Sequence, residues 1–187
     1  VNLMRAALPR GSAPQPGQFT HARELAGALE RLAGWLSEAG ARRLAAEDVR
    51  PILRVVDTFG FHLAVVDIRQ NSAFHDEALA DLLALGGVEG GAEYASWPSE
   101  QRRPILDHEL RSRRPLVRKK DVRSEKAQAV LELHERVSAF IDAFGVDGVG
   151  ALIVSMTRSA EDLLGVHLLA REGGLLRYDE DGQAWLP

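Results

Sequence analysis

The chain has 187 residues, of which 45% are hydrophobic and 27% charged, a composition typical of a globular protein with a sizeable core. Its net charge of -4 gives no general attraction to nucleic acid or to acidic membranes. The absence of cysteine excludes disulfides, thiolate metal sites and a cysteine nucleophile. No apolar run reaches the roughly 18 residues of a membrane span, and no signal peptide is recognisable, so the sequence predicts a cytoplasmic protein.

The first part of the chain predicts a linker followed by two helices. Residues 1–19 are predicted as a linker or N-terminal extension, because "PRGSAPQPGQ" contains three prolines, two glycines and no large apolar side chain. Residues 20–187 are predicted as one segment. Leucines at helical spacing (Leu25, Leu29, Leu32 and Leu36) predict a helix that Thr20 caps and Gly40 ends. A second helix is predicted from about residue 45 to 58.

The rest of the chain predicts two strands, each followed at once by a helix. The strands are predicted at 61–70 and 150–156, and the helices at 71–85, 96–110, 124–144 and 159–172. The fold class is therefore α/β and predominantly helical. Parallel strands of this buried type need neighbours on both sides, so we expect a segment of a longer chain.

The first strand ends on two charged residues, in "FGFHLAVVDIRQ". Because side chains alternate along a strand, Asp67 and Arg69 share one face, and Val66 and Ile68 share the other, which we expect to pack under helices. An arginine at the carboxyl end of a barrel strand suits a phosphate or carboxylate, since its planar fork donates two parallel hydrogen bonds. The alternative is a structural ion pair between Asp67 and Arg69.

The second strand ends with Ser155 at the equivalent position, and Arg158 follows. The next helix begins near Ser159, where free backbone N–H groups are able to hold an anion. Asp162 lies three residues further on, close to the spacing of a capping box, so ordinary helix capping is the favoured interpretation.

Other polar features are weaker signals. His75 lies in the first turn of a helix, where we expect it to be exposed to solvent. Seven Lys or Arg residues fall within residues 111–123, without an interleaved aromatic residue to stack on bases. A solvated loop or an interdomain contact is favoured over nucleic-acid binding.

Three stretches of the sequence resemble the phosphoenolpyruvate carboxylase family. "TFGFHLAVVDIRQNSAFHDEAL" follows the pattern FG-x-x-L-x-x-x-DIRQ-x-S-x-x-H-x-x-AL. "ELRSRRPL" follows E-L-x-S-x-RPL, and "GALIVSMTRSAEDLLGVHLLAREGGL" is similar to A-x-x-ISM-x-x-x-SD-x-L-x-V-x-LL-x-KE-x-G-L. The three matches occur in the family's order and at compatible spacing, over about residues 58 to 176.

The resemblance implies a partial segment of a helix-elaborated (β/α)8 barrel, usually in a homotetramer. It implies condensation of phosphoenolpyruvate with bicarbonate to give oxaloacetate and phosphate, which is carbon dioxide fixation, with Mg²⁺ or Mn²⁺ as cofactor. In the family, the arginine of DIRQ helps to bind the substrate phosphate, and this role carries over to Arg69. Asp67 is expected to orient Arg69, and Ser155 is a further candidate substrate contact.

Departures from the family pattern limit what this segment is expected to do alone. Nothing matches the T-A-H-P-T-E motif that carries the family's catalytic histidine, or its glycine-rich loop. The metal-binding glutamate of an F-E-T motif would follow Leu186 and Pro187, where this sequence stops. We therefore assign no catalytic residue and no metal ligand here, and expect the segment alone to be inactive. The alternative hypothesis is a catalytically silent module that binds a partner chain, or itself, through its open strands.

Overall fold

The computed structural model describes residues 18–112, 114–181 and 183–187, which form parts of two compact units. The first unit comprises the described part of Val1–Val66 together with Phe140–Gly150, and the second comprises Asp67–Ala139 with Ala151–Pro187. Most of the predicted linker, residues 1–17, lies outside the described residues.

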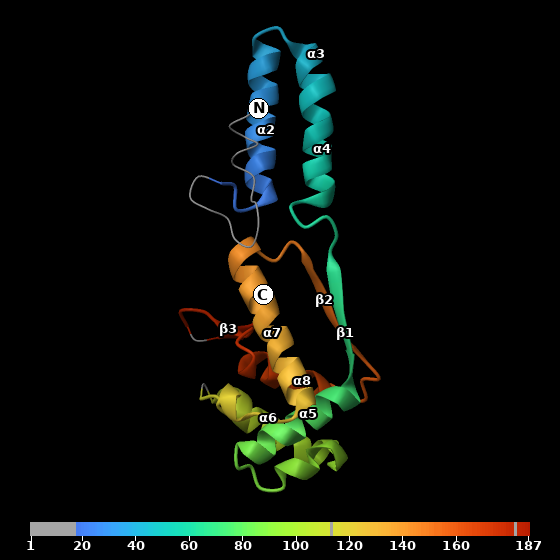
Figure 1. Cartoon of the computed structure of the whole chain (residues 1–187), viewed down its shortest axis with the longest axis vertical. Coiled ribbons are helices and arrows are strands. Elements are labelled where there is room, and N and C mark those ends of the chain that lie inside the picture. Colours follow the sequence, from blue (N-terminus) through green and yellow to red (C-terminus); the bar gives the residue numbers. More distant parts are fainter. Residues whose placement is uncertain (1–17, 113, 182) are drawn as a thin grey trace. The chain divides into compact units, whose positions relative to one another are not determined.

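The first unit contains a helical hairpin, visible as α2 and α4 in Figure 1. Helix α2 (Ala22–Glu38) packs against a continuous helical stretch made of α3 (Arg42–Leu44), a π-helical turn (Ala45–Val49) and α4 (Arg50–Phe59). The buried side chains between them are Leu25, Leu29, Val49 and Val56. Both helices were predicted, but the second begins three residues earlier than expected. The N-cap of α2 is His21 rather than Thr20, whose N–H instead donates to the Glu24 carboxylate at 2.7 Å.

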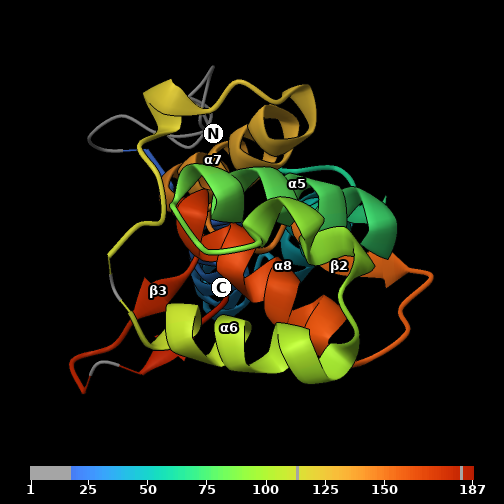
Figure 2. The ribbon, with the colours of Figure 1, turned by 90° about the horizontal axis from the view of Figure 1, so that it is seen from below.

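The second unit is built around α5 (Ser72–Leu85), whose Ala78, Leu79, Leu82 and Leu83 are almost fully buried. Figure 2 shows α5 beside α8 (Ala160–Glu172), with α6 (Ser99–Arg111) and α7 (Glu125–Phe144) on opposite sides. Two short 3-10 helices, Gly91–Ser96 and Lys119–Asp121, complete the connections. Helices α5 and α8 approach closely because Gly165 has no side chain: a Cβ there would lie 2.7 Å from a methyl carbon of Leu79.

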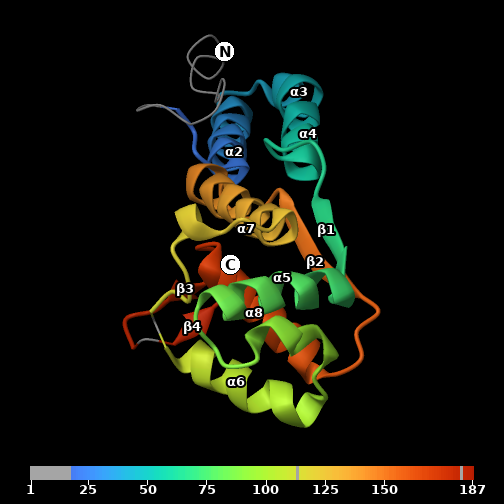
Figure 3. The same cartoon turned by 60° about the horizontal axis from the view of Figure 1, so that its bottom comes forward.

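The strands β1 (Val66–Asn71) and β2 (Val149–Ser155) pair with each other and run side by side (Figure 3). Side-chain hydrogen bonds between the strands join residue 67 to 151 and residue 70 to 155, so the residue numbers rise together and the pair is parallel. Helix α5 begins at the residue after β1, and α8 begins five residues after β2 ends. A small antiparallel hairpin near the C-terminus, β3 (Arg177–Tyr178) and β4 (Ala184–Trp185), was not predicted.

Two features of the first strand differ from the prediction. The strand begins at Val66 rather than residue 61, because residues 61–65 form turns in which Leu63 takes the positive φ of 64°. On the face that was expected to pack under helices, Val66 is 64% exposed, whereas Ile68 is half-buried. The described residues form only the two-stranded parallel sheet and the short hairpin, so a barrel requires strands from outside them. None of the described helices has the length and apolar content needed to cross a bilayer.

Two histidines lie inside the second unit. His75 of α5 is buried, which contradicts the expected solvent exposure, and His134 of α7 is buried as well. Neither ring nitrogen of His134 makes a hydrogen bond of normal geometry. Burial, followed by the nearby charge of His75, lowers the pKa of His134 to about 4, although the Val130 carbonyl opposes this shift.

Acid is therefore expected to destabilise the second unit. The unfolded chain takes up a proton at His134 below its ordinary pKa of 6.5, whereas the folded chain resists protonation down to about pH 4. Stability contributed by the neutral imidazole is complete above pH 6.5 and is lost as the pH falls from there toward 4. The expected loss between pH 7 and pH 5 is about 2 kcal/mol. Urea unfolding at the two pH values measures it, and His134→Leu should flatten the dependence. Equal pH slopes in the variant and the wild type would refute this assignment.

Candidate functional site at the strand exits

Asp67 and Arg69 lie beside each other on β1, as their spacing predicted, but they are the second and fourth of its six residues rather than its carboxyl end. An Arg69 terminal nitrogen lies 3.8 Å from an Asp67 carboxylate oxygen, and the two side chains are 73% and 43% exposed. The other Asp67 oxygen accepts a hydrogen bond from the Ala151 N–H of β2 at 3.1 Å. Asp67 therefore ties the two strands together, while the guanidinium of Arg69 remains largely open to solvent.

The ends of the two strands are joined by hydroxyl groups. Ser155 donates to the Gln70 carbonyl at 3.4 Å, and Ser72, the first residue of α5, donates to the Met156 carbonyl at 2.8 Å. Met156 has a φ of 59°, a left-handed conformation that is uncommon for a residue other than glycine. Its side chain is also 79% exposed. Strained backbone of this kind concentrates at functional sites and persists where surrounding contacts hold it.

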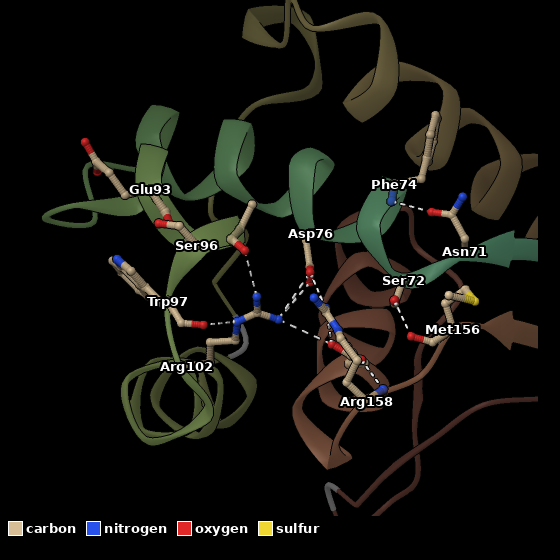
Figure 4. A network of polar contacts seen from close by, with 12 residues as sticks. Asn71, Ser72, Phe74, Asp76, Glu93, Ser96, Trp97, Arg102, Met156 and Arg158 are labelled. Carbon is tan, nitrogen blue, oxygen red and sulfur yellow. Dashed lines mark hydrogen bonds and ion pairs between the residues drawn. The ribbon is translucent and has the colours of Figure 1, made fainter.

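A network of arginines and aspartates lies directly behind the strand exits (Figure 4). Arg158, on the loop between β2 and α8, pairs with Asp162 at 2.8 Å and also with Asp76 of α5. Its backbone N–H donates to Asp162 as well, at 2.8 Å. Asp162 therefore binds Arg158 rather than completing a capping box with Ser159, which makes no side-chain cap. Both aspartates are buried, whereas the Arg158 side chain is 52% exposed.

Arg102 of α6 holds the same two aspartates from the interior. One of its terminal nitrogens lies 3.2 Å from Asp76 and 3.3 Å from Asp162. Its remaining N–H groups donate to the carbonyls of Trp97 at 2.8 Å and Ala95 at 2.9 Å, and the guanidinium lies over the ring of Tyr94. The buried cluster contains two positive and two negative groups, which satisfies the requirement that buried charges be paired.

The ionisation of this cluster follows from its contacts. Burial alone would raise the pKa of Asp162, but hydrogen bonds from the Arg158 side chain and backbone, with the charges of Arg158 and Arg102, hold it below its usual value. Hydrogen bonds to Asp162 and Asp76 raise the pKa of Arg158 above its ordinary range. Both groups therefore remain charged at neutral pH.

The motif "ELRSRRPL" is fixed to the end of α8 by a second buried pair, Arg171 and Glu172, whose side chains lie 2.6 Å apart. Arg171 donates to the carbonyls of Glu109 and Ser112, and Glu172 accepts from the Leu116 N–H at 3.0 Å. The basic run of residues 111–123 overlaps this motif. Its described part is largely exposed, and Arg113 lies outside the described residues. The third family-like stretch thus contacts each of the other two in the folded chain.

Of the predicted site residues, Asp67 and Arg69 lie beside each other on β1, whereas Ser155, the last residue of β2, contacts the Gln70 carbonyl. Sequence reasoning missed Arg102 as an anchor of the site and gave Asp76 no role. One signal was available for Arg102, since it lies four residues before the buried Leu106 and therefore on the inward face of α6.

The described residues do not suit the Mg²⁺ or Mn²⁺ that the resemblance implies. No group of three or more His, Asp or Glu side chains converges among them as a metal site would require. The buried carboxylates at the strand exits, Asp76 and Asp162, are already paired with arginines. We therefore derive no step through a metal held by these residues.

Two paired parallel strands, each followed by a helix, are the kind of unit that α/β folds contain, and here β1 carries an exposed arginine. The profile of the family described as phosphoenolpyruvate carboxylase matches residues 3–186. Phosphoenolpyruvate carboxylase of Nocardia farcinica is 35% identical over 175 residues, 93% of this chain and 19% of that protein. The enzyme of Rhodothermus marinus is 38% identical over 160 residues, 85% of this chain and 17% of that protein. The enzyme of Burkholderia mallei is 37% identical over 167 residues, 89% of this chain and 17% of that protein.

The chain belongs to the phosphoenolpyruvate carboxylase family. It spans less than a fifth of the length of these curated relatives.

Proposed function

We propose that this chain is the phosphate-contacting segment of a phosphoenolpyruvate carboxylase. In a complete protein of this kind, phosphoenolpyruvate and bicarbonate give oxaloacetate and phosphate. Arg69 binds the phosphate of phosphoenolpyruvate, Asp67 orients the guanidinium, and Ser155, at the exit of β2, is a further substrate contact. The proposal is supported by the exposed Arg69 side chain on a parallel strand, two residues before that strand ends, within a family-matched segment.

The geometry supports this role for Arg69 in two ways. Its fork is 73% exposed, so a phosphate is able to reach it, and its one ion pair with Asp67 is long at 3.8 Å. A bidentate phosphate contact is shorter and charge-assisted, so phosphate competes well for the guanidinium. The rest of the proposal follows the family: a (β/α)8 barrel completed by other strands, a homotetramer, a cytoplasmic location, and Mg²⁺ or Mn²⁺ held by residues outside this segment.

The isolated chain is expected to show no carboxylase activity, because the described residues offer neither a metal site nor a recognisable catalytic histidine. Oxaloacetate formation is measured with phosphoenolpyruvate, bicarbonate and Mg²⁺. The matched positive sample is a graft in which residues 58–176 replace the corresponding segment of the Rhodothermus marinus enzyme, which we expect to be active. Metal-dependent activity of the isolated chain would contradict the first expectation, and a folded but inactive graft would contradict the second.

A second candidate function, an interaction module without catalysis, is favoured by the apolar side chains exposed along and beside the strands. Leu63 is 78% exposed, Val65 58%, Val66 64% and Met156 79%. An open apolar strand is a template for pairing with another chain. We therefore expect the isolated chain to associate at high concentration, as light scattering would detect.

One comparison separates association through the strand from nonspecific hydrophobic association. Val66→Lys should reduce association, whereas Trp35→Lys, on α2 and also exposed at 63%, should leave it nearly unchanged. A wild-type chain that remains strictly monomeric at high concentration would count against this second function.

A further inference from the structure

The half-exposed Arg158 is not needed to satisfy either aspartate from within the protein, because Arg102 already contacts both. Arg158 nevertheless reaches the same two carboxylates from the loop after β2 (Figure 4). Its backbone N–H is also held by Asp162. Arg158 thus adds a positive charge to the cluster. It also links the loop after β2 to α5 and α8 through its contacts with Asp76 and Asp162.

The charge count explains why a second arginine is present. With Arg158 the cluster holds two positive and two negative groups and is neutral. Without Arg158, two aspartates would face Arg102 alone, which leaves one uncompensated negative charge. That charge would lie behind the strand exits, where Asp76 occupies the first turns of the helix that follows β1 directly. An anion approaching the exits would then be repelled.

We propose that Arg158 is a positioning residue for anion binding at the strand exits. It neutralises Asp76 and Asp162, and it fixes the loop after β2 so that the exit of β2 stays ordered. This inference rests on the proposed function, since it takes the anion to be a phosphate held by Arg69. Arg158 itself need not touch that phosphate, because its guanidinium is engaged by the two aspartates.

The test compares five forms of the whole chain: wild type, Arg158→Gln, the double variant Arg158→Gln/Asp76→Asn, Arg69→Ala and Arg103→Gln. Arg103 is the matched control, because its half-exposed side chain pairs with Asp107 and Glu161 rather than with Asp76 or Asp162. Two quantities are measured by NMR. One is amide hydrogen exchange in β1, in β2 and in the loop that follows β2. The other is the chemical-shift response of those amides to inorganic phosphate at constant ionic strength.

We expect Arg158→Gln to speed exchange at residues 155–158 by about 10-fold or more and to weaken the phosphate response by about 3- to 10-fold, while Arg103→Gln changes neither. The double variant is again neutral, so it should recover most of the phosphate response. If Arg158→Gln matched Arg103→Gln, or changed exchange without changing the phosphate response, the inference would be overturned. A lost phosphate response that Asp76→Asn does not restore would mean that Arg158 contacts the anion directly, which also overturns the positioning role.

The proposed function is tested separately by Arg69→Ala, which should abolish the phosphate response without speeding exchange around Arg158. A phosphate response that survives Arg69→Ala would contradict the proposed function, while the comparison of Arg158→Gln with its double variant would still decide the role of Arg158. A wild-type chain with no phosphate response would overturn both.

Discussion

Replacing Arg69 with alanine is expected to reduce kcat/KM for phosphoenolpyruvate by about 30- to 1000-fold in the active graft. A charge-assisted, bidentate contact with a phosphate contributes roughly 2 to 4 kcal/mol where water is largely excluded. Arg69→Lys should recover only part of the loss, because lysine keeps the charge but loses the planar fork. Steady-state kinetics with varied phosphoenolpyruvate measures kcat/KM for the unsubstituted graft, the Arg69→Ala variant and the Arg69→Lys variant.

The same substitution should have little effect on folding. The ion pair between Arg69 and Asp67 is long and exposed, and such pairs contribute at most about 1 kcal/mol. Thermal melts on the same preparations provide the control. Unchanged kinetics together with a sharply lowered melting temperature would identify Arg69 as a structural strand cap, the alternative that its spacing with Asp67 left open.

Replacing Arg102 with alanine is expected to have the opposite profile, with a large loss of stability. Arg102 is buried and hydrogen-bonded to two aspartates and two backbone carbonyls. Breaking a buried charge network from one side leaves uncompensated charge, at a cost of about 3 to 5 kcal/mol. Urea unfolding of the second unit at pH 7 measures the change.

The neighbouring residue provides the control for this prediction. Arg103 is also on α6, but its 3.0 Å pair with Asp107 lies at the surface, so Arg103→Ala should cost less than about 1 kcal/mol. If Arg102→Ala destabilised the chain no more than Arg103→Ala, the buried cluster would not be a structural anchor of the site.

The helices of this chain were largely predictable because their signals are local. The predicted bounds of α2, α5, α7 and α8 agree with the observed ones to within a few residues, and Asn71 caps α5 by accepting from the Phe74 N–H at 2.8 Å. The alternation along β1 likewise placed Asp67 beside Arg69. Each of these features depends on residues within one or two turns of helix or a few positions of strand.

The features that were missed depend on residues far apart in the sequence. Arg102 is buried only because Asp76 and Asp162 receive it, 26 and 60 positions away. An arginine in a charged helix gives no local sign of such partners. Val66 was wrongly predicted to be covered, because an apolar strand does not reveal whether the elements that cover it belong to the same segment.

A crystal structure of the graft with phosphoenolpyruvate bound tests most directly whether Arg69 holds the phosphate. We expect two guanidinium nitrogens of Arg69 to lie about 2.7 to 3.0 Å from phosphate oxygens, with Asp67 beside them. A phosphate bound elsewhere, with Arg69 still facing solvent and paired only with Asp67, would contradict it.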